Sequence, residues 1–287
     1  GTRAQISTGV YNHHIVIAAA GKPSVPLTSC KALGALNSLG DGTIPLTTFL
    51  SADNAEATDT VFTTADGKFN SGFYVSPSTR MMLTGMLVNY NPEPMDVYVN
   101  LEIEYVPGKP AQLADASNAL ISVGGCKGVN FTPKPNSQET LKSEAYNMPQ
   151  DGYIINAYGH LHDGGVNTKL FVNGKMVCVS EATYGTQGAA TEVNGEKWET
   201  ISKMSTCPGP FPIKKGDVVT MTSDYDTQLH PLRANSGHSH AGAESGAEGG
   251  DAHGAAEGDM EGMGGMSGEA DAMGMFKFSW AVAPGQM

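Results

Sequence analysis

Short runs of alternating apolar and polar residues, separated by Gly, Pro and Asn, recur along this sequence, and helical periodicity is nearly absent. Residues 97–105 (VYVNLEIEY) alternate with the period of two that a half-buried β-strand requires. Residues 169–172 and 175–179 flank Asn173-Gly174, a dipeptide that favours the tight turn of a β-hairpin. We therefore predict an all-β protein built from antiparallel sandwiches or jelly rolls.

The strand pattern divides at residues 106–110 (VPGKP), where Pro and Gly interrupt it. We predict two jelly-roll-like antiparallel β-sandwiches, formed by residues 1–107 and residues 108–287. The second ends in a strand whose aromatic residues alternate at 276–280, which gives it one aromatic face.

A compositionally distinct segment lies inside the second predicted sandwich. Residues 234–272 contain no Lys, Arg, Leu, Ile, Val or aromatic residue and are rich in Gly, Ala, His, Met and acidic residues. Such a stretch cannot bury enough apolar surface to offset the entropy lost on ordering. Because a core-like strand follows, we predict a mobile, low-complexity insertion within the domain.

Charge and hydropathy disfavour two kinds of partner. Acidic residues outnumber Lys and Arg by 29 to 17, and the net charge of −12 repels phosphate backbones, so we expect no nucleic acid. No apolar run reaches the roughly eighteen residues of a membrane span. No leader-like segment opens the sequence, and we expect any secretion signal to have been removed. The oligomeric state is left open.

Cysteine spacing and one sequon point to an extracellular protein. None of the four cysteines forms a C-x-x-C pair, so disulfides are favoured over a zinc ribbon, with free buried thiols as the alternative. Cys178 and Cys207 are the preferred pair, since both lie near strand ends of one predicted domain, which leaves Cys30 with Cys126. Asn130 begins an Asn-x-Thr glycosylation sequon. We predict a secreted, disulfide-bonded glycoprotein.

Two histidine motifs are candidate metal sites. His160 and His162 are two residues apart, and on a strand such residues face the same way about 7 Å apart, so both imidazoles can reach one ion. His13 and His14 are neighbours, which point to opposite faces unless the strand bends or ends there. The alternative for both motifs is a pair of surface histidines.

Methionines near the end of the chain favour copper as the metal. Thioethers suit copper, especially Cu(I), and hardly suit zinc, calcium or magnesium. Met273 is in phase with Met275, on the face of the last predicted strand opposite its aromatic residues. Its side chain can therefore lie on the same surface as the His-x-His pair. The methionines of the insertion are either filler or loose copper ligands. His230 or His238 is the preferred additional ligand, because these residues follow a well-marked strand.

The order of these motifs resembles the ascorbate-dependent type II copper monooxygenases, which include peptidylglycine α-hydroxylating monooxygenase and dopamine β-monooxygenase. The similar segments are residues 12–15 (NHHI), 159–162 (GHLH) and 271–276 (DAMGMF). The phrases at 159–165 (GHLHDGG) and 171–175 (FVNGK) are closer still to secreted, mostly uncharacterised proteins grouped as stress-up-regulated nodulin-like.

The resemblance implies a copper-dependent redox site. By analogy, His160, His162 and Met273 would hold the copper that binds dioxygen, and His13 and His14 would form part of a second copper site that relays electrons. One or two coppers per chain are therefore expected, with a small-molecule or phenolic substrate and a reductant such as ascorbate.

One departure from the family pattern concerns the second copper site. Asn89 stands where the family has a third histidine, and an amide is a poor copper ligand, so that site is incomplete or takes its third ligand elsewhere. The favoured hypothesis is a secreted copper-dependent monooxygenase or oxidase. The alternatives are a non-catalytic copper-binding or copper-buffering protein and a structural cell-surface protein.

Overall fold

The structure, a computed structural model, describes residues 6–23, 47–53, 59–124, 130–148, 150–186, 189–193, 196–232 and 272–282. Within these ranges the chain is strand and loop apart from one 3₁₀ turn, η1 (Ile6–Thr8). The predicted all-β fold with antiparallel sheets is confirmed. No helix in the described ranges is long and apolar enough to cross a bilayer.

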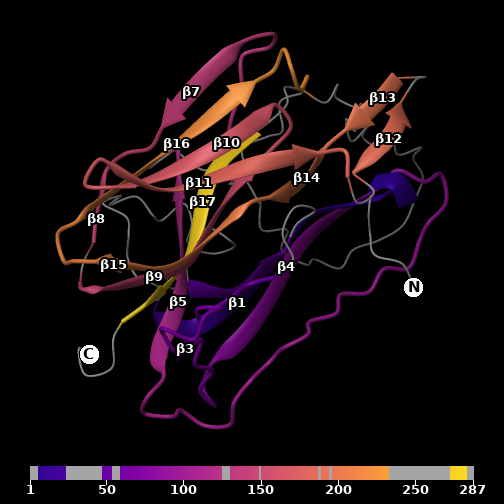
Figure 1. Ribbon diagram of the computed structural model, residues 1–287. Helices are drawn as coiled ribbons and strands as arrows, with labels where there is room; N and C mark the ends of the chain where they lie inside the picture. The colour runs from indigo at the N-terminus through magenta and orange to yellow at the C-terminus, as the bar shows by residue number, and fades with distance from the viewer. Residues whose placement is uncertain are drawn as a thin grey trace, which may run out of the picture.

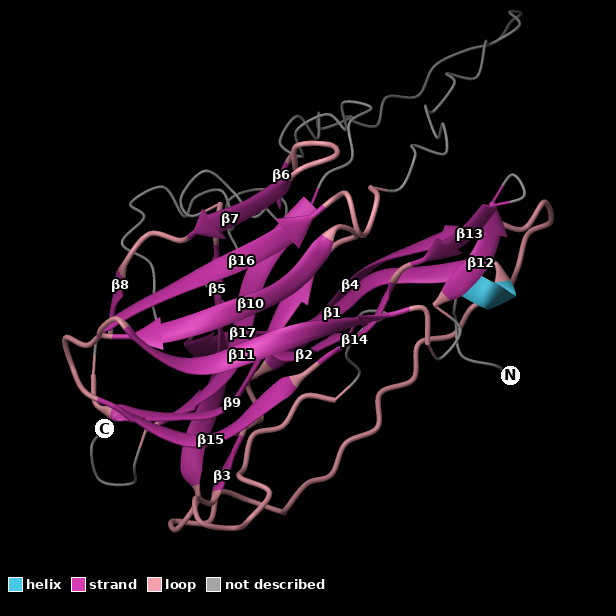
Figure 2. Ribbon diagram, turned by 45° about the horizontal axis from the view of Figure 1, so that its top comes forward, coloured by secondary structure: helices cyan, strands magenta, loops and turns pink. Residues whose placement is uncertain are grey.

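Two six-stranded sheets, most of whose strands come from the second half of the chain, stack on each other (Figures 1 and 2). The first, called the β9–β17 sheet, consists of β15 (Thr206–Ile213), β9 (Gly152–Leu161), β17 (Ala272–Ala281), β5 (Ala114–Ser122) and β3 (Ser71–Gly72) in that order, with β6 (Asn130–Phe131) paired to β17. The second, called the β10–β16 sheet, consists of β14 (Ile201–Met204), β11 (Lys175–Tyr184), β10 (Gly165–Val172), β16 (Val218–Asp226) and β7 (Gln138–Lys142), with β8 (Tyr146–Asn147) paired to β16.

The core lies between these two sheets. Phe276, Phe278 and Trp280 of β17 are almost fully buried and pack with Leu170 of β10 and Val219 of β16. The aromatic face predicted for the last strand therefore forms the centre of the sandwich. Its opposite face, which points away from the β10–β16 sheet, is called the outer face of the β9–β17 sheet.

Two local predictions within the sandwich are confirmed. Asn173 and Gly174 connect β10 and β11 with positive φ angles of 50° and 76°, which these two residue types tolerate. Cys178 of β11 and Cys207 of β15 form the preferred disulfide and tie one sheet to the other. Cys30 and Cys126 lie outside the described residues.

A three-stranded N-terminal sheet, of order β2-β1-β4, lies against the outer face (Figure 1). Its strands are β1 (Val10–Pro23), β2 (Thr47–Asp53) and β4 (Arg80–Asn89). Elsewhere in the chain, β12 (Ala190–Val193) and β13 (Glu196–Glu199) form a separate two-stranded hairpin. Asn118 of β5 donates to the carbonyl of Phe49 in β2 at 2.8 Å, and β3, from the predicted first domain, pairs with β5 of the second. The division into residues 1–107 and 108–287 stays a prediction.

The strand predicted at 97–105 is wrong. These residues have no regular secondary structure, and their apolar side chains are exposed, with Tyr98 and Tyr105 at 84% and 77%. Alternation provides one apolar face, but a strand also needs a neighbour for its backbone hydrogen bonds. Within the described ranges no strand pairs with this segment.

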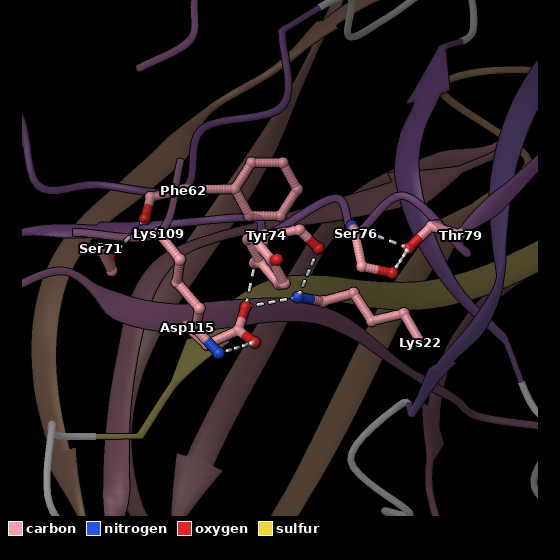
Figure 3. Close-up of polar contacts among 8 residues, drawn as sticks. All are labelled: Lys22, Phe62, Ser71, Tyr74, Ser76, Thr79, Lys109 and Asp115. Atoms are coloured by element: carbon pink, nitrogen blue, oxygen red, sulfur yellow. Dashed lines mark hydrogen bonds and ion pairs between the residues drawn. The ribbon is translucent and has the colours of Figure 1, made fainter. Parts of the chain in front are cut away.

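A buried ion pair fixes β1 to β5 (Figure 3). Nζ of Lys22, whose side chain is 7% exposed, donates to Asp115 and, at 3.2 Å, to the carbonyl of Tyr74. The ammonium also lies 4.3 Å from the centre of the Phe73 ring. Burial lowers the pKa of Lys22, and the hydrogen bond to Asp115 opposes this shift. Lys109 is a more exposed and more distant cation, at 3.8 Å from Asp115.

We expect replacement of Cys178 and Cys207 together by Ala to lower the free energy of unfolding by about 3 kcal/mol, because the crosslink closes a loop and restricts the unfolded chain. Urea unfolding followed by Trp fluorescence measures the loss. The single variant Cys178→Ala should lose a similar amount. Equal unfolding free energies for wild type and double variant would contradict the pairing.

We expect Asp115→Asn to destabilise the protein by about 3 kcal/mol, because it leaves the buried ammonium of Lys22 without its counter-charge. Lys109→Met is the matched control and should cost less than about 1 kcal/mol, since its side chain is partly in solvent. Both values come from urea unfolding. A loss in Asp115→Asn no greater than in the control would disprove the role of the pair.

Candidate metal centre

The His-x-His motif lies at the end of β9. Leu161, between the two histidines, is fully buried and points into the sandwich. His160 and His162 therefore project from the outer face. Their ring centroids are 5.1 Å apart, with the rings edge to face. The alternation thus brings the two imidazoles together, as the sequence predicted.

The two glycines after the motif turn the chain from β9 into β10. Gly164 has a φ of +94°, and the N–H of Gly165 donates to the carbonyl of His162 at 2.9 Å. A Cβ atom on Gly165 would come within 2.5 Å of the Cβ atom of Leu161. Gly-Gly is thus required for a sharp turn directly behind His162.

The pairing of β9 with β17 brings methionine to the same surface. Met275 is paired with His160, and Gly274 with Leu161. Directly opposed residues of an antiparallel pair share a face, so Met275 lies beside His160 on the outer face. Met273, two residues earlier, is on this face too, next to the position of His162. Both methionines are partly buried.

The His-His motif lies in β1 at a bulge. Asn12 pairs with Leu87 and His14 with Met86, so that His13 is the extra residue of β1 opposite β4. A bulge bends a strand and redirects its side chains, which is the condition for both histidines to reach one metal. The position of the His13 side chain is not among the described features.

Electrostatics connects His14 to the His-x-His motif. Burial lowers the pKa of His14, and the positive charge of His160 lowers it further. Because such an interaction requires proximity, the N-terminal sheet brings its histidine motif near that of β9. The lowered pKa favours the neutral imidazole of His14, the form that binds a metal.

Asn89 is used in a turn. Its Nδ2 atom donates to the carbonyl of Glu93 at 2.9 Å, and its Oδ1 atom accepts from the backbone N–H of Asn91 at 3.0 Å. These bonds close the turn that follows β4. The residue that replaces the expected histidine thus has a structural function at this position.

Of the two histidines predicted as additional ligands, only His230 is among the described residues. The ring of His230 stacks on Tyr184, with centroids 3.7 Å apart and planes 3° from parallel. Burial lowers its pKa, and the charges of Asp226 and Glu199 oppose the shift. His238 lies outside the described residues. The sequon residue Asn130 is in β6, and its glycosylation stays a prediction.

The donor set on the outer face fits copper better than a hard cation. Within the described part of the chain, no three His, Cys, Asp or Glu side chains are placed to hold a metal ion together. On the outer face, Met273 and Met275 offer sulfur in addition to the imidazoles of His160 and His162. Nitrogen and thioether donors together suit copper, above all Cu(I).

Comparisons with known proteins relate one segment of this chain to a family. Residues 117–232 match the family described as Stress up-regulated Nod 19. The predicted resemblance to these proteins is confirmed for this segment, which contains His160 and His162. The match ends before β17, so Met273 and Met275 lie beyond it.

The chain is also similar to a protein of Phoma sp. named "Probable copper-dependent oxygenase M1". The two are 20% identical over 172 residues, which make up 60% of this chain and 43% of that protein. The chain therefore spans less than half the length of this relative. The similarity relates the chain to a protein whose name states copper-dependent oxygenation.

We expect His160→Gln to raise the pKa of His14, because it removes a positive charge that disfavours protonation of the neighbouring imidazole. NMR titration of the metal-free protein with labelled histidine measures the change. His230→Gln is the control and should leave the pKa of His14 unaltered. An unchanged pKa in His160→Gln would show that the two motifs do not interact.

Proposed function

We propose that this protein is a secreted, copper-dependent redox enzyme, a monooxygenase or oxidase that takes electrons from an external reductant. The observation that carries the proposal is the register of β9 and β17, in which His160 faces Met275 and Met273 lies on the same face. The relative's name supports copper as the metal.

His160, His162 and Met273 would hold the ion, and Met275 is a second thioether next to them. A bound copper would supply one-electron chemistry with dioxygen, using electrons from a reductant such as ascorbate. Leu161 and the aromatic core of β17 keep water from the inner side of this surface. The ligand side chains are thus fixed to two rigid strands, which limits their movement.

The His-His motif is the candidate for a second copper. The bulge at His13 and the lowered pKa of His14 favour metal binding, whereas Asn89 is engaged in its turn. A second ion would therefore need a third ligand from elsewhere. The substrate class, a small molecule or a phenol, belongs to the proposal as well.

The disulfide supports export to an oxidising compartment. Cys178 and Cys207 link the two sheets of the sandwich, and such bonds persist mainly in secreted and extracellular proteins. Glycosylation at Asn130 would accompany the same route.

We expect the purified protein to bind Cu(I) stoichiometrically under anaerobic conditions. The double variant His160→Ala/His162→Ala should weaken Cu(I) binding more than about 100-fold, and Met273→Leu should weaken Cu(I) more than Cu(II), since a thioether prefers the reduced ion. Competition with a Cu(I) chelator measures affinity. Met176→Leu, an exposed methionine of β11, is the control and should have no effect.

If the His160→Ala/His162→Ala variant bound Cu(I) as tightly as the wild type, the proposal would be disproved. Oxygen consumption with ascorbate separates the enzyme from a copper store. Copper-dependent consumption that is lost in the double variant supports the enzyme, whereas tight copper binding without consumption indicates a buffering protein.

A further inference from the structure

We propose that Tyr225 is a positioning residue of the copper site, whose hydroxyl joins the backbones of His162 and Met273 and sets the distance between their side chains. This inference rests on the proposed function, because it concerns two of the ligands assigned there.

The hydroxyl bridges the point at which β9 and β17 separate. The last pair of these strands is Leu161 with Gly274, after which the chain turns away from β17 through the Gly-Gly turn. Beyond this pair, the hydroxyl of Tyr225 donates to the carbonyl of Met273 at 2.7 Å and accepts from the N–H of His162 at 3.3 Å. It therefore takes the place of the next backbone contact between the strands.

Tyr225 reaches this point from the other sheet. It lies in β16, is 1% exposed and belongs to a buried cluster with Leu161 and Ala272. Phe131 packs against its ring edge-on, with centroids 5.1 Å apart. A Cβ atom on Gly164 would come within 3.3 Å of the Tyr225 ring, so the turn glycine also leaves room for it.

The buried ring fixes the hydroxyl, and the hydroxyl fixes the two ligands. Removal of the oxygen leaves the partly buried carbonyl of Met273 and N–H of His162 without this bond, which favours separation of the strand ends or entry of water. The side chains of His162 and Met273 would then lose their common spacing. Groups that orient metal ligands in this way typically affect metal affinity 10- to 100-fold when they are removed.

Tyr225→Phe tests the role, because it keeps the ring and its contact with Phe131 and removes only the oxygen. Tyr146→Phe is the matched control, a buried tyrosine whose hydroxyl reaches Ser122 at 3.5 Å and not the β9–β17 joint. X-ray absorption of the Cu(I)-loaded full chain and chelator competition give the readouts. We expect Tyr225→Phe to lose sulfur scattering and about 10- to 100-fold in Cu(I) affinity, and Tyr146→Phe to keep both.

A double-variant cycle separates positioning from a general loss of stability. If Tyr225 acts through the methionine, Tyr225→Phe should weaken Cu(I) binding much less in a Met273→Leu background than in the wild type. Should Tyr225→Phe fail to fold, Phe131→Leu replaces it, since this change releases the ring but keeps the oxygen. The same loss of sulfur scattering is then expected.

The outcomes for wild type and variant are distinct. Cu(I) binding without sulfur scattering in the wild type, or no binding, overturns the proposed donor set and this inference together. Wild-type binding with sulfur scattering that persists unchanged in Tyr225→Phe overturns the inference alone, as does full additivity with Met273→Leu.

Discussion

The register between β9 and β17 is the constraint on which the candidate site depends. Successive side chains of a strand face opposite sides, so a slip of β17 by one residue against β9 would turn Phe276 outward and Met275 into the core. Burial of the large apolar side chains makes this slip costly. The packed core thus fixes which donor side chains of β9 and β17 face outward.

Period-two alternation in the sequence was sufficient to predict which side chains of a single strand share a face. It gave the all-β class, the common face of His160 and His162, and the aromatic face of β17. The same signal failed at residues 97–105, which have the pattern but no neighbouring strand in the described ranges. Alternation reports which residues could share a face, whereas a strand exists only where another backbone supplies its hydrogen bonds.

Contacts between distant segments could not be read from the sequence. The sequence alone shows that Met275 is in phase with Met273. The pairing of Met275 with His160, however, depends on the order of strands in the sheet. Tyr225 carries no motif, and it becomes relevant only because β16 crosses behind the Gly-Gly turn. Nor does a single Asn89 in a sequence reveal that its amide closes a turn.

The position of β17 has a consequence for biosynthesis. It is the last described strand in the sequence, yet it lies between β9 and β5 in the middle of its sheet. During translation, β5 and β9 leave the ribosome with their facing edges unpaired, and such edges are prone to aggregation. The sandwich can be completed only after residue 281 has emerged. The outer face of the β9–β17 sheet is therefore complete only after β17 has been synthesised.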